Sequence, residues 1–104
     1  MGNNDIRSKL YKKIKNIGFT IPNIVDSTAI LANNMQLGEG IFIRKRPVLN
    51  SDVKVGNMCI INTGAIIEHE SYIGDFSHIS IGVILCGNVF INKNVFIGAN
   101  SIII

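Results

Sequence analysis

A branched aliphatic residue occupies every sixth position of this chain from Val25 to Ile103, without a slip. The series is Val25, Leu31, Leu37, Ile43, Leu49, Val55, Ile61, Ile67, Ile73, Ile79, Leu85, Ile91, Ile97 and Ile103. An α-helical stripe would drift out of phase with such a period, and an alternating strand has a period of two. A period of six indicates a parallel β-helix in which three hexads, about 18 residues, make one triangular coil.

Different positions of each hexad have different expected roles. The aliphatic residue fills the interior, and a mostly small or slim residue follows four places later, as at Ala65 and Ser71. Glycine or asparagine often comes directly after the aliphatic, as at Gly38 and Gly74, and we expect these residues to adopt positive φ at a corner. The sequence therefore predicts an all-β domain of about four coils, at 25 to 42, 43 to 60, 61 to 78 and 79 to 96, with an incomplete coil from 97.

The first 24 residues do not follow the hexads. Residues 5–16 place Ile6, Leu10 and Ile14 at four-residue spacing among lysines, which predicts a short amphipathic helix that needs a surface to pack on. Residues 19–24 are expected to form a brief extended segment interrupted by Pro22. The predicted division is thus a lead-in at 1–24 and a β-helical domain at 25–104. Because the chain stops at Ile104 in mid-coil without a polar cap, we expect a fragment of a longer protein.

Composition argues against several classes of protein. The two cysteines, Cys59 and Cys86, have no CxxC spacing, so we expect neither a disulfide framework nor a metal site, and a cytoplasmic location. No apolar run approaches the roughly 20 residues of a membrane span. The basic residues cluster at 7–15 and 44–46 without an aromatic platform, which argues against a nucleic-acid partner despite the net charge of +3.

The residues with the most chemical potential lie between Ile61 and Gly87. His69 stands between Glu68 and Glu70, either of which could orient it as a general base; the alternative is a solvated surface histidine. Residues 18 apart should stack, which places His69 beside Gly87. The Gly87 N–H could then stabilise an oxyanion in acyl transfer, although a corner glycine can also be present for its dihedral angles.

Two further residues of the same region are candidates for a chemical role. His78 lies half a coil from His69, so the two imidazoles should point from different sides of the prism and could meet only across a subunit interface. Cys86 is a possible nucleophile, but nothing in its sequence neighbourhood would lower its pKa.

The segments INTGAIIEHE at 61–70, YIGDFSHIS at 72–80 and VILCGNVFINKNVFIGANSII at 83–103 resemble the left-handed β-helix acyltransferases. More narrowly, they resemble the bacterial sugar acetyltransferases related to sialic-acid O-acetyltransferase and to the UDP-4-amino-sugar N-acetyltransferase of bacillosamine synthesis. The lead-in is similar to the last helix and strand of that family's N-terminal nucleotide-sugar-binding domain.

This resemblance implies an acetyl-CoA-dependent acetyltransferase that acts on a sugar or nucleotide-sugar amine or hydroxyl by direct transfer. It implies that His69 is the general base, that Glu70 tunes it and that the Gly87 amide faces the thioester carbonyl of acetyl-CoA. His78 would line the acetyl-CoA site, and Asn62 would lie near the acceptor. It also implies a homotrimer with active sites between the prisms.

Two alternatives stay open at this point. The chain could be a catalytically silent β-helical fragment with a structural or assembly role, or a hexapeptide acetyltransferase with a non-sugar acceptor.

Overall fold

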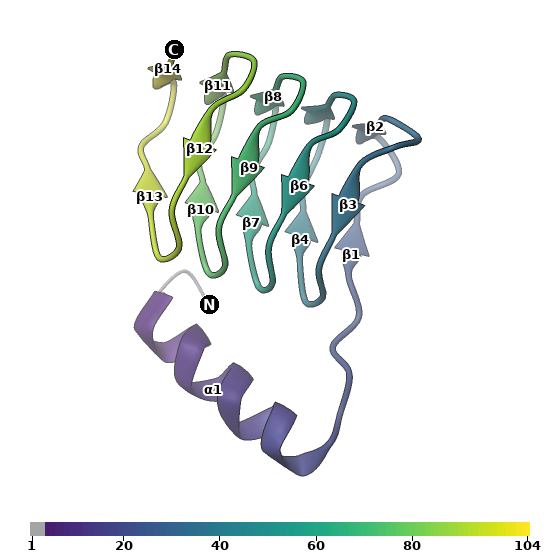
Figure 1. The fold of residues 1–104 in the computed structure, drawn as a ribbon, viewed down its shortest axis with the longest axis vertical. Coiled ribbons are helices and arrows are strands. Elements are labelled where there is room, and N and C mark those ends of the chain that lie inside the picture. The colour runs from purple at the N-terminus through teal and green to yellow at the C-terminus, as the bar shows by residue number, and fades with distance from the viewer. Residues whose placement is uncertain (1–3) are drawn as a thin grey trace.

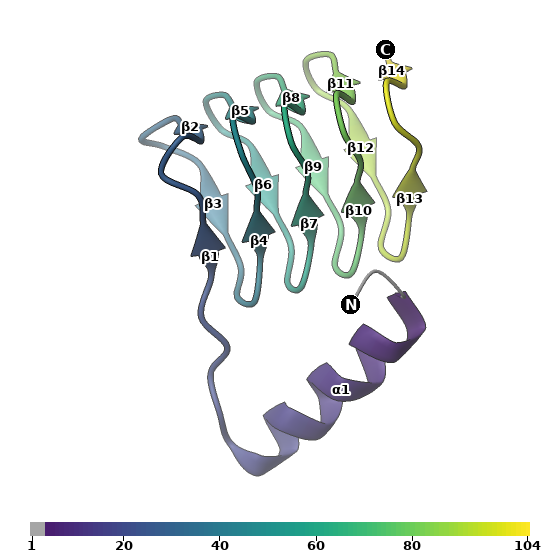
Figure 2. The same ribbon diagram turned by 180° about the vertical axis from the view of Figure 1, so that it is seen from behind.

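The computed structural model describes residues 4–104, which form one helix and a left-handed β-helix of about four coils. In each coil the chain rises on one side of the prism, turns at the top and returns on another side, as Figures 1 and 2 show from opposite directions. The predicted fold class is confirmed.

The solenoid has three parallel sheets, built from strands of two residues each. Sheet A contains β1 (Ile24–Val25), β4 (Phe42–Ile43), β7 (Ile60–Ile61), β10 (His78–Ile79) and β13 (Phe96–Ile97). Sheet B contains β2 (Ile30–Leu31), β5 (Val48–Leu49), β8 (Ile66–Ile67), β11 (Ile84–Leu85) and β14 (Ile102–Ile103). Sheet C contains β3 (Gln36–Leu37), β6 (Lys54–Val55), β9 (Tyr72–Ile73) and β12 (Phe90–Ile91).

The second residue of each strand points into the prism, and these are the aliphatics of the sequence series. Ile43, Ile61 and Ile79 lie in one row of sheet A and are all 0% exposed. Strand pairing is 18 residues apart throughout, as in Ile43 with Ile61, which confirms the predicted register. Burial of this aliphatic column supplies the apolar stabilisation that short strands lack on their own.

The expectation about positive φ at the corners is wrong in position. Positive φ occurs at every sixth residue from Gly40 to Asn100, which is three places after the aliphatic rather than one. Gly38 and Gly74 have no positive φ. Non-glycine residues such as Phe76, at φ 61°, occupy most of these corners, because hydrogen bonds from the neighbouring coil hold the backbone there.

The glycines that follow the aliphatics are instead needed for close approach between coils. A Cβ on Gly56 would lie 2.3 Å from Asp75 Oδ1 and 2.8 Å from the Asp75 nitrogen. The same Asp75 oxygen accepts the Asn57 N–H at 2.8 Å, so the side chain of one coil caps the backbone of the coil before it.

Helix α1 (Asn4–Ile17) confirms the predicted helix at 5–16, but a different face docks on the solenoid. Leu10 is 41% exposed, whereas Arg7 is 2% exposed. The Arg7 guanidinium donates to the carbonyls of Met58 and Phe76, the latter at 3.2 Å. Figures 1 and 2 show α1 beneath the loops that join sheet C to sheet A.

Glu39 is the second anchor of the helix. Its Oε1 accepts from the Tyr11 hydroxyl at 2.8 Å and pairs with Lys15 Nζ at 2.9 Å. Its Oε2 accepts the Ile21 N–H at 3.2 Å, which fixes the lead-in. Residues 19–23 form no strand of their own, and the extended segment expected there continues directly into β1. Within residues 4–104, no helix has the length and apolar character needed to cross a membrane.

Candidate active site

His69 and Glu70 form the turn between β8 and β9, at the corner where sheet B meets sheet C. Backbone bonds hold this corner from both neighbouring coils. The Glu70 N–H donates to the Ser51 carbonyl at 3.0 Å, and the Asn88 N–H donates to the His69 carbonyl at 2.8 Å. The two side chains project outward and are 60% and 64% exposed, so a rigid backbone presents them to solvent.

The His69 imidazole lies directly over Gly87 of the next coil, which confirms the predicted pairing. A Cβ on Gly87 would be 2.5 Å from His69 Nε2 and 2.6 Å from Cε1, so a side chain there would displace the imidazole. Gly87 does not have positive φ, whereas Asn88 after it has φ 61°. The dihedral explanation for this glycine therefore fails, and the close approach of the imidazole requires it.

The backbone N–H of Gly87 is available at this contact. Across the described residues 4–104 it donates to no acceptor, while the next N–H along the chain is used by the His69 carbonyl. A base nitrogen and a hydrogen-bond donor thus occupy adjacent coils at one corner. An imidazole and a backbone N–H are groups that can act as a base and as an oxyanion donor in acyl transfer.

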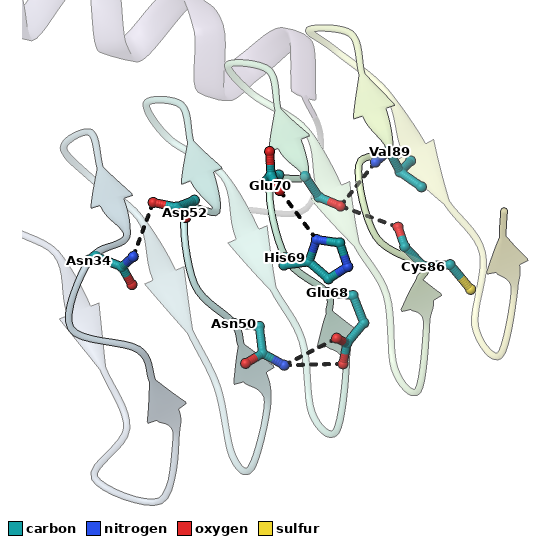
Figure 3. Close-up of polar contacts among 9 residues, drawn as sticks. Asn34, Asn50, Asp52, Glu68, His69, Glu70, Cys86 and Val89 are labelled. Atoms are coloured by element: carbon teal, nitrogen blue, oxygen red, sulfur yellow. Dashed lines mark hydrogen bonds and ion pairs between the residues drawn. The ribbon is translucent and has the colours of Figure 1, made fainter.

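Glu70, rather than Glu68, faces His69. Glu70 Oε1 lies 3.6 Å from His69 Nδ1, within ion-pair range and longer than a hydrogen bond. Both oxygens of Glu68 accept from the Asn50 side-chain amide of the preceding coil, at 3.1 and 3.2 Å. Figure 3 shows His69 between the two carboxylates, with only Glu70 joined to it.

Ser71 is a residue that the sequence interpretation treated only as a slim side chain. It is 0% exposed, and its hydroxyl accepts the Val89 N–H at 3.1 Å while donating to the Cys86 carbonyl at 3.4 Å. These two bonds bracket Gly87 and tie it to the coil of His69 (Figure 3). The sequence signal for this role was the Ser71 hydroxyl, because most other hexads have an aliphatic residue or alanine at the same position.

His78 lies elsewhere on the prism. It is on the outer face of β10 in sheet A, where Phe96 packs edge-on against its ring with centroids 5.0 Å apart. Burial, followed by the nearby charge of Arg7, lowers the pKa of His78 and favours the neutral imidazole. Both its ring nitrogens are buried, and neither has a hydrogen-bond partner among the described residues.

Asn62 also lies apart from His69, at the corner where sheet A meets sheet B. Its Oδ1 accepts the Thr63 N–H at 2.8 Å. A single chain therefore brings together His69, Glu70 and Gly87, and separates them from Asn62 and His78.

Of the two cysteines, only Cys86 lies at this corner, directly before Gly87. Cys59 is buried in the core and donates to the Gly74 carbonyl at 3.1 Å, and burial raises its pKa to about 11. The Cys86 thiol is free and half-buried, and the Cys86 backbone carbonyl accepts from the Ser71 hydroxyl. Among residues 4–104, no group of three or more His, Cys, Asp or Glu side chains is placed to hold a metal ion.

No protein-family model matches the chain. By sequence it is 33% identical over 93 residues to the bifunctional protein GlmU of Bartonella bacilliformis, which covers 73% of this chain and 21% of that protein. The bifunctional protein GlmU of Clostridioides difficile is 34% identical over 96 residues, covering 75% of this chain and 20% of that protein. The chain thus spans about a fifth of the length of these relatives.

Solved structures share the fold over the whole chain. The acetyltransferase domain of PglB from Neisseria gonorrhoeae has a TM-score of 0.78 at 20% identity, with 60% of that domain covered. A mutant of perosamine N-acetyltransferase from Caulobacter crescentus, in complex with CoA and GDP-perosamine, has a TM-score of 0.73 at 20% identity, with 58% covered. The chain therefore has the β-helical fold that these acetyltransferases use.

Proposed function

We propose that this chain is the β-helical part of an acetyltransferase that moves an acetyl group from acetyl-CoA to a sugar or nucleotide-sugar. The observation that carries the proposal is the His69 imidazole packed against Gly87, whose N–H donates to no acceptor among the described residues. Acetyltransferases with the same fold, one in complex with acetyl-CoA and another with CoA, support the choice of acetyl donor.

In the proposed reaction, an acceptor amine or hydroxyl attacks the thioester carbonyl carbon directly. His69 takes the proton that the acceptor loses, and Glu70 at 3.6 Å stabilises the imidazolium that forms. The Gly87 N–H donates to the carbonyl oxygen as it becomes negative. The carbon–sulfur bond then breaks, and the leaving sulfur receives the proton from His69. Because base, donor and acceptor share one corner, orientation contributes much of the rate.

A nucleotide-linked amino sugar is the proposed acceptor. The structural neighbour from Caulobacter crescentus was solved with GDP-perosamine and is named an N-acetyltransferase. An amine is also the better match for a base such as imidazole, because the proton needs removal only as the carbon–nitrogen bond forms.

Residues 1–24 are proposed to belong to a nucleotide-sugar-binding unit and 25–104 to the acetyltransferase unit. The exposed apolar side chains of the lead-in support this division. Ile17 is 64% exposed and Phe19 is 62% exposed, which is typical of residues that another part of a protein covers.

The proposed assembly is a homotrimer with active sites between the prisms. Two of the three outer faces carry rows of apolar side chains that need a partner surface. Sheet A displays Ile24, Phe42 and Phe96, at 62%, 39% and 60% exposure, and sheet B displays Ile30 and Ile102, at 63% and 61%. In such a trimer, His78 of one chain would lie toward His69 of the next and serve the acetyl-CoA site, with Asn62 near the acceptor.

A reducing, cytoplasmic location fits this proposal, because Cys59 and Cys86 are both free thiols.

Thiol release from acetyl-CoA, measured with GDP-perosamine and a panel of nucleotide-linked 4-amino sugars, tests the function. We expect acceptor-dependent release that His69→Ala lowers roughly 10²- to 10⁴-fold, the usual contribution of a general base. Ser51→Ala, at the same corner one coil earlier, is the matched control and should keep its activity. Full activity of His69→Ala would show that the base is wrongly assigned. Absence of release with every acceptor would favour a structural role.

A further inference from the structure

The outer face of sheet C differs from the apolar outer faces of sheets A and B. Register pairing places Gln36, Lys54, Tyr72 and Phe90 in one row along this face. The row passes from polar to aromatic as it reaches the two coils that carry His69 and Gly87. This is the side of the prism that the proposed trimer contacts would leave open.

Tyr72 and Phe90 form a stacked pair. Their ring centroids are 4.9 Å apart with an interplanar angle of 6°, and the residues are 38% and 68% exposed. A stacked aromatic pair across neighbouring strands stabilises a sheet. Because the rings stack face to face, the pair leaves the ring edges and one outer face of each ring free for another apolar group.

A hollow of about 450 Å³ opens beside these rings and reaches the active-site corner. Tyr72 and Phe90 line it together with Asp52, Lys54, Glu70 and Asn88. Glu70 directly follows His69, and Asn88 directly follows Gly87, so two lining residues of the hollow are the chain neighbours of the proposed reacting groups. Its volume falls within the roughly 300 to 1,000 Å³ that small-molecule sites occupy.

We propose that this hollow holds the pyranose ring of the acceptor, with the C–H face of the sugar against the exposed edge of the Tyr72–Phe90 stack. Asp52, Glu70 and Asn88 supply carboxylate and amide groups for its hydroxyls and its amine. The sugar ring thereby lies beside His69, with the amine facing the base. The inference rests on the proposed acetyltransferase function and assigns its acceptor subsite.

The charges of the hollow favour the sugar ring over phosphate groups. Two carboxylates and one ammonium group, from Lys54, line it, so phosphates, whether of CoA or of the acceptor's nucleotide, would meet net negative charge within it. A sugar ring has no such conflict, because its hydroxyls can donate hydrogen bonds to the carboxylates. A second hollow of about 260 Å³, lined by Asp75, Asn92 and Lys93, adjoins the same rings and leaves room for the group that the sugar carries.

Amide NMR titration of the full chain tests the subsite directly. GDP-perosamine and D-glucosamine are the probes, and at least one should shift the amides of Lys54, Tyr72 and Phe90, while CoA alone should leave these three amides unshifted. The double variant Tyr72→Ala/Phe90→Ala should raise the Kd roughly tenfold, which corresponds to about 1.4 kcal/mol. Asn33→Ala changes an exposed residue at the same corner two coils before His69, outside the hollow, and should leave the Kd unchanged.

The outcomes separate this inference from the proposed function. Shifts at these amides without any acetyl transfer would keep the subsite and overturn the function. Acetyl transfer that depends on His69 but keeps the same acceptor KM in the double variant would do the reverse. The inference is also wrong if neither probe shifts these amides, or if the double variant changes only the melting temperature.

Discussion

Gly87 and Gly74 occupy corners of adjacent coils but meet different neighbours. A Cβ on Gly87 would meet the tip of the exposed His69 ring, which can move aside, whereas a Cβ on Gly74 would lie 2.5 Å from the Lys93 backbone nitrogen. We expect Gly87→Ala to lower kcat about 10- to 100-fold by displacing the base, with little change in stability. Gly74→Ala should instead lower the free energy of unfolding by about 1–3 kcal/mol.

Gly98→Ala is the control for both changes, because nothing lies within 4 Å of a Cβ at that position. Thermal unfolding and acetyl transfer, measured on all three variants, check the prediction. An active Gly87→Ala enzyme would show that the imidazole position is unimportant for the reaction.

Ser71 acts on the site through hydrogen bonds to the coil of Gly87. Its replacement by alanine leaves the buried Val89 N–H without its acceptor, which should cost about 1–3 kcal/mol of stability. Ser77→Ala removes the matching bonds to Asn92 and Val95 and should cost a similar amount. Urea unfolding measures both losses. If Ser71 positions Gly87, its variant loses more acetyl transfer than the Ser77 variant at equal stability; equal losses of activity would contradict this role.

At the residue level, the sequence was informative wherever stacking alone determines a neighbour. The 18-residue register was sufficient to predict that His69 meets Gly87. It could not predict that Glu68 turns to Asn50 and leaves Glu70 to face the imidazole, because that choice depends on side-chain contacts between coils. It also misplaced the positive-φ corners, because glycine can serve close approach as well as dihedral freedom.

At the level of elements, helix α1 shows what hydrophobic periodicity can predict about a helix and what it cannot. Its limits were predicted to within a residue at each end, yet the docked face was not. Hydrophobic spacing pointed to Leu10, while the solenoid surface beneath the helix offers backbone carbonyls and the Glu39 carboxylate. Polar groups of that kind select Arg7 and Tyr11, and no pattern within the helix reveals them.

The docking of α1 should weaken in acid. Hydrogen bonds from Lys15 and then Tyr11 lower the pKa of Glu39 below its ordinary value of 4.5. A depressed pKa means that the folded state prefers the carboxylate, so the stabilisation is present above about pH 4.5 and is lost as the pH falls through the lower, folded pKa. Hydrogen exchange of the α1 amides should therefore accelerate in that range.

Glu39→Gln keeps the size of the side chain and removes its charge. The variant should show faster α1 exchange at neutral pH and no further acceleration in acid. Asp26, whose pKa is also lowered but whose partner is Thr28 on a distant corner, gives a control substitution, Asp26→Asn, with unchanged helix exchange. A pH profile that is the same with and without Glu39 would contradict this account.

For the whole molecule, the solenoid divides the candidate site between surfaces that face apart. The His69 corner lies between sheets B and C, while His78 lies on sheet A, so one chain cannot use both at one reacting centre. The hexad pattern was enough to predict this separation. The hollow beside Tyr72 and Phe90 was not predictable from it, because the hexads specify inward residues and leave the outer rows undefined.

A mixed trimer tests whether neighbouring chains complete each other's sites. His69→Ala and His78→Ala chains should each be nearly inactive alone, because every site lacks one imidazole. When the two are co-expressed and assemble at random, roughly a quarter of the interfaces pair an intact His69 with an intact His78, so about a quarter of wild-type activity should return. Sedimentation of the mixture checks that trimers form, and Ile66→Asp, on the outer row of sheet B, should give inactive monomers. If the mixed trimers regain no activity, His69 and His78 of neighbouring chains do not complete one site. If the monomer is active, the reaction does not need a subunit interface.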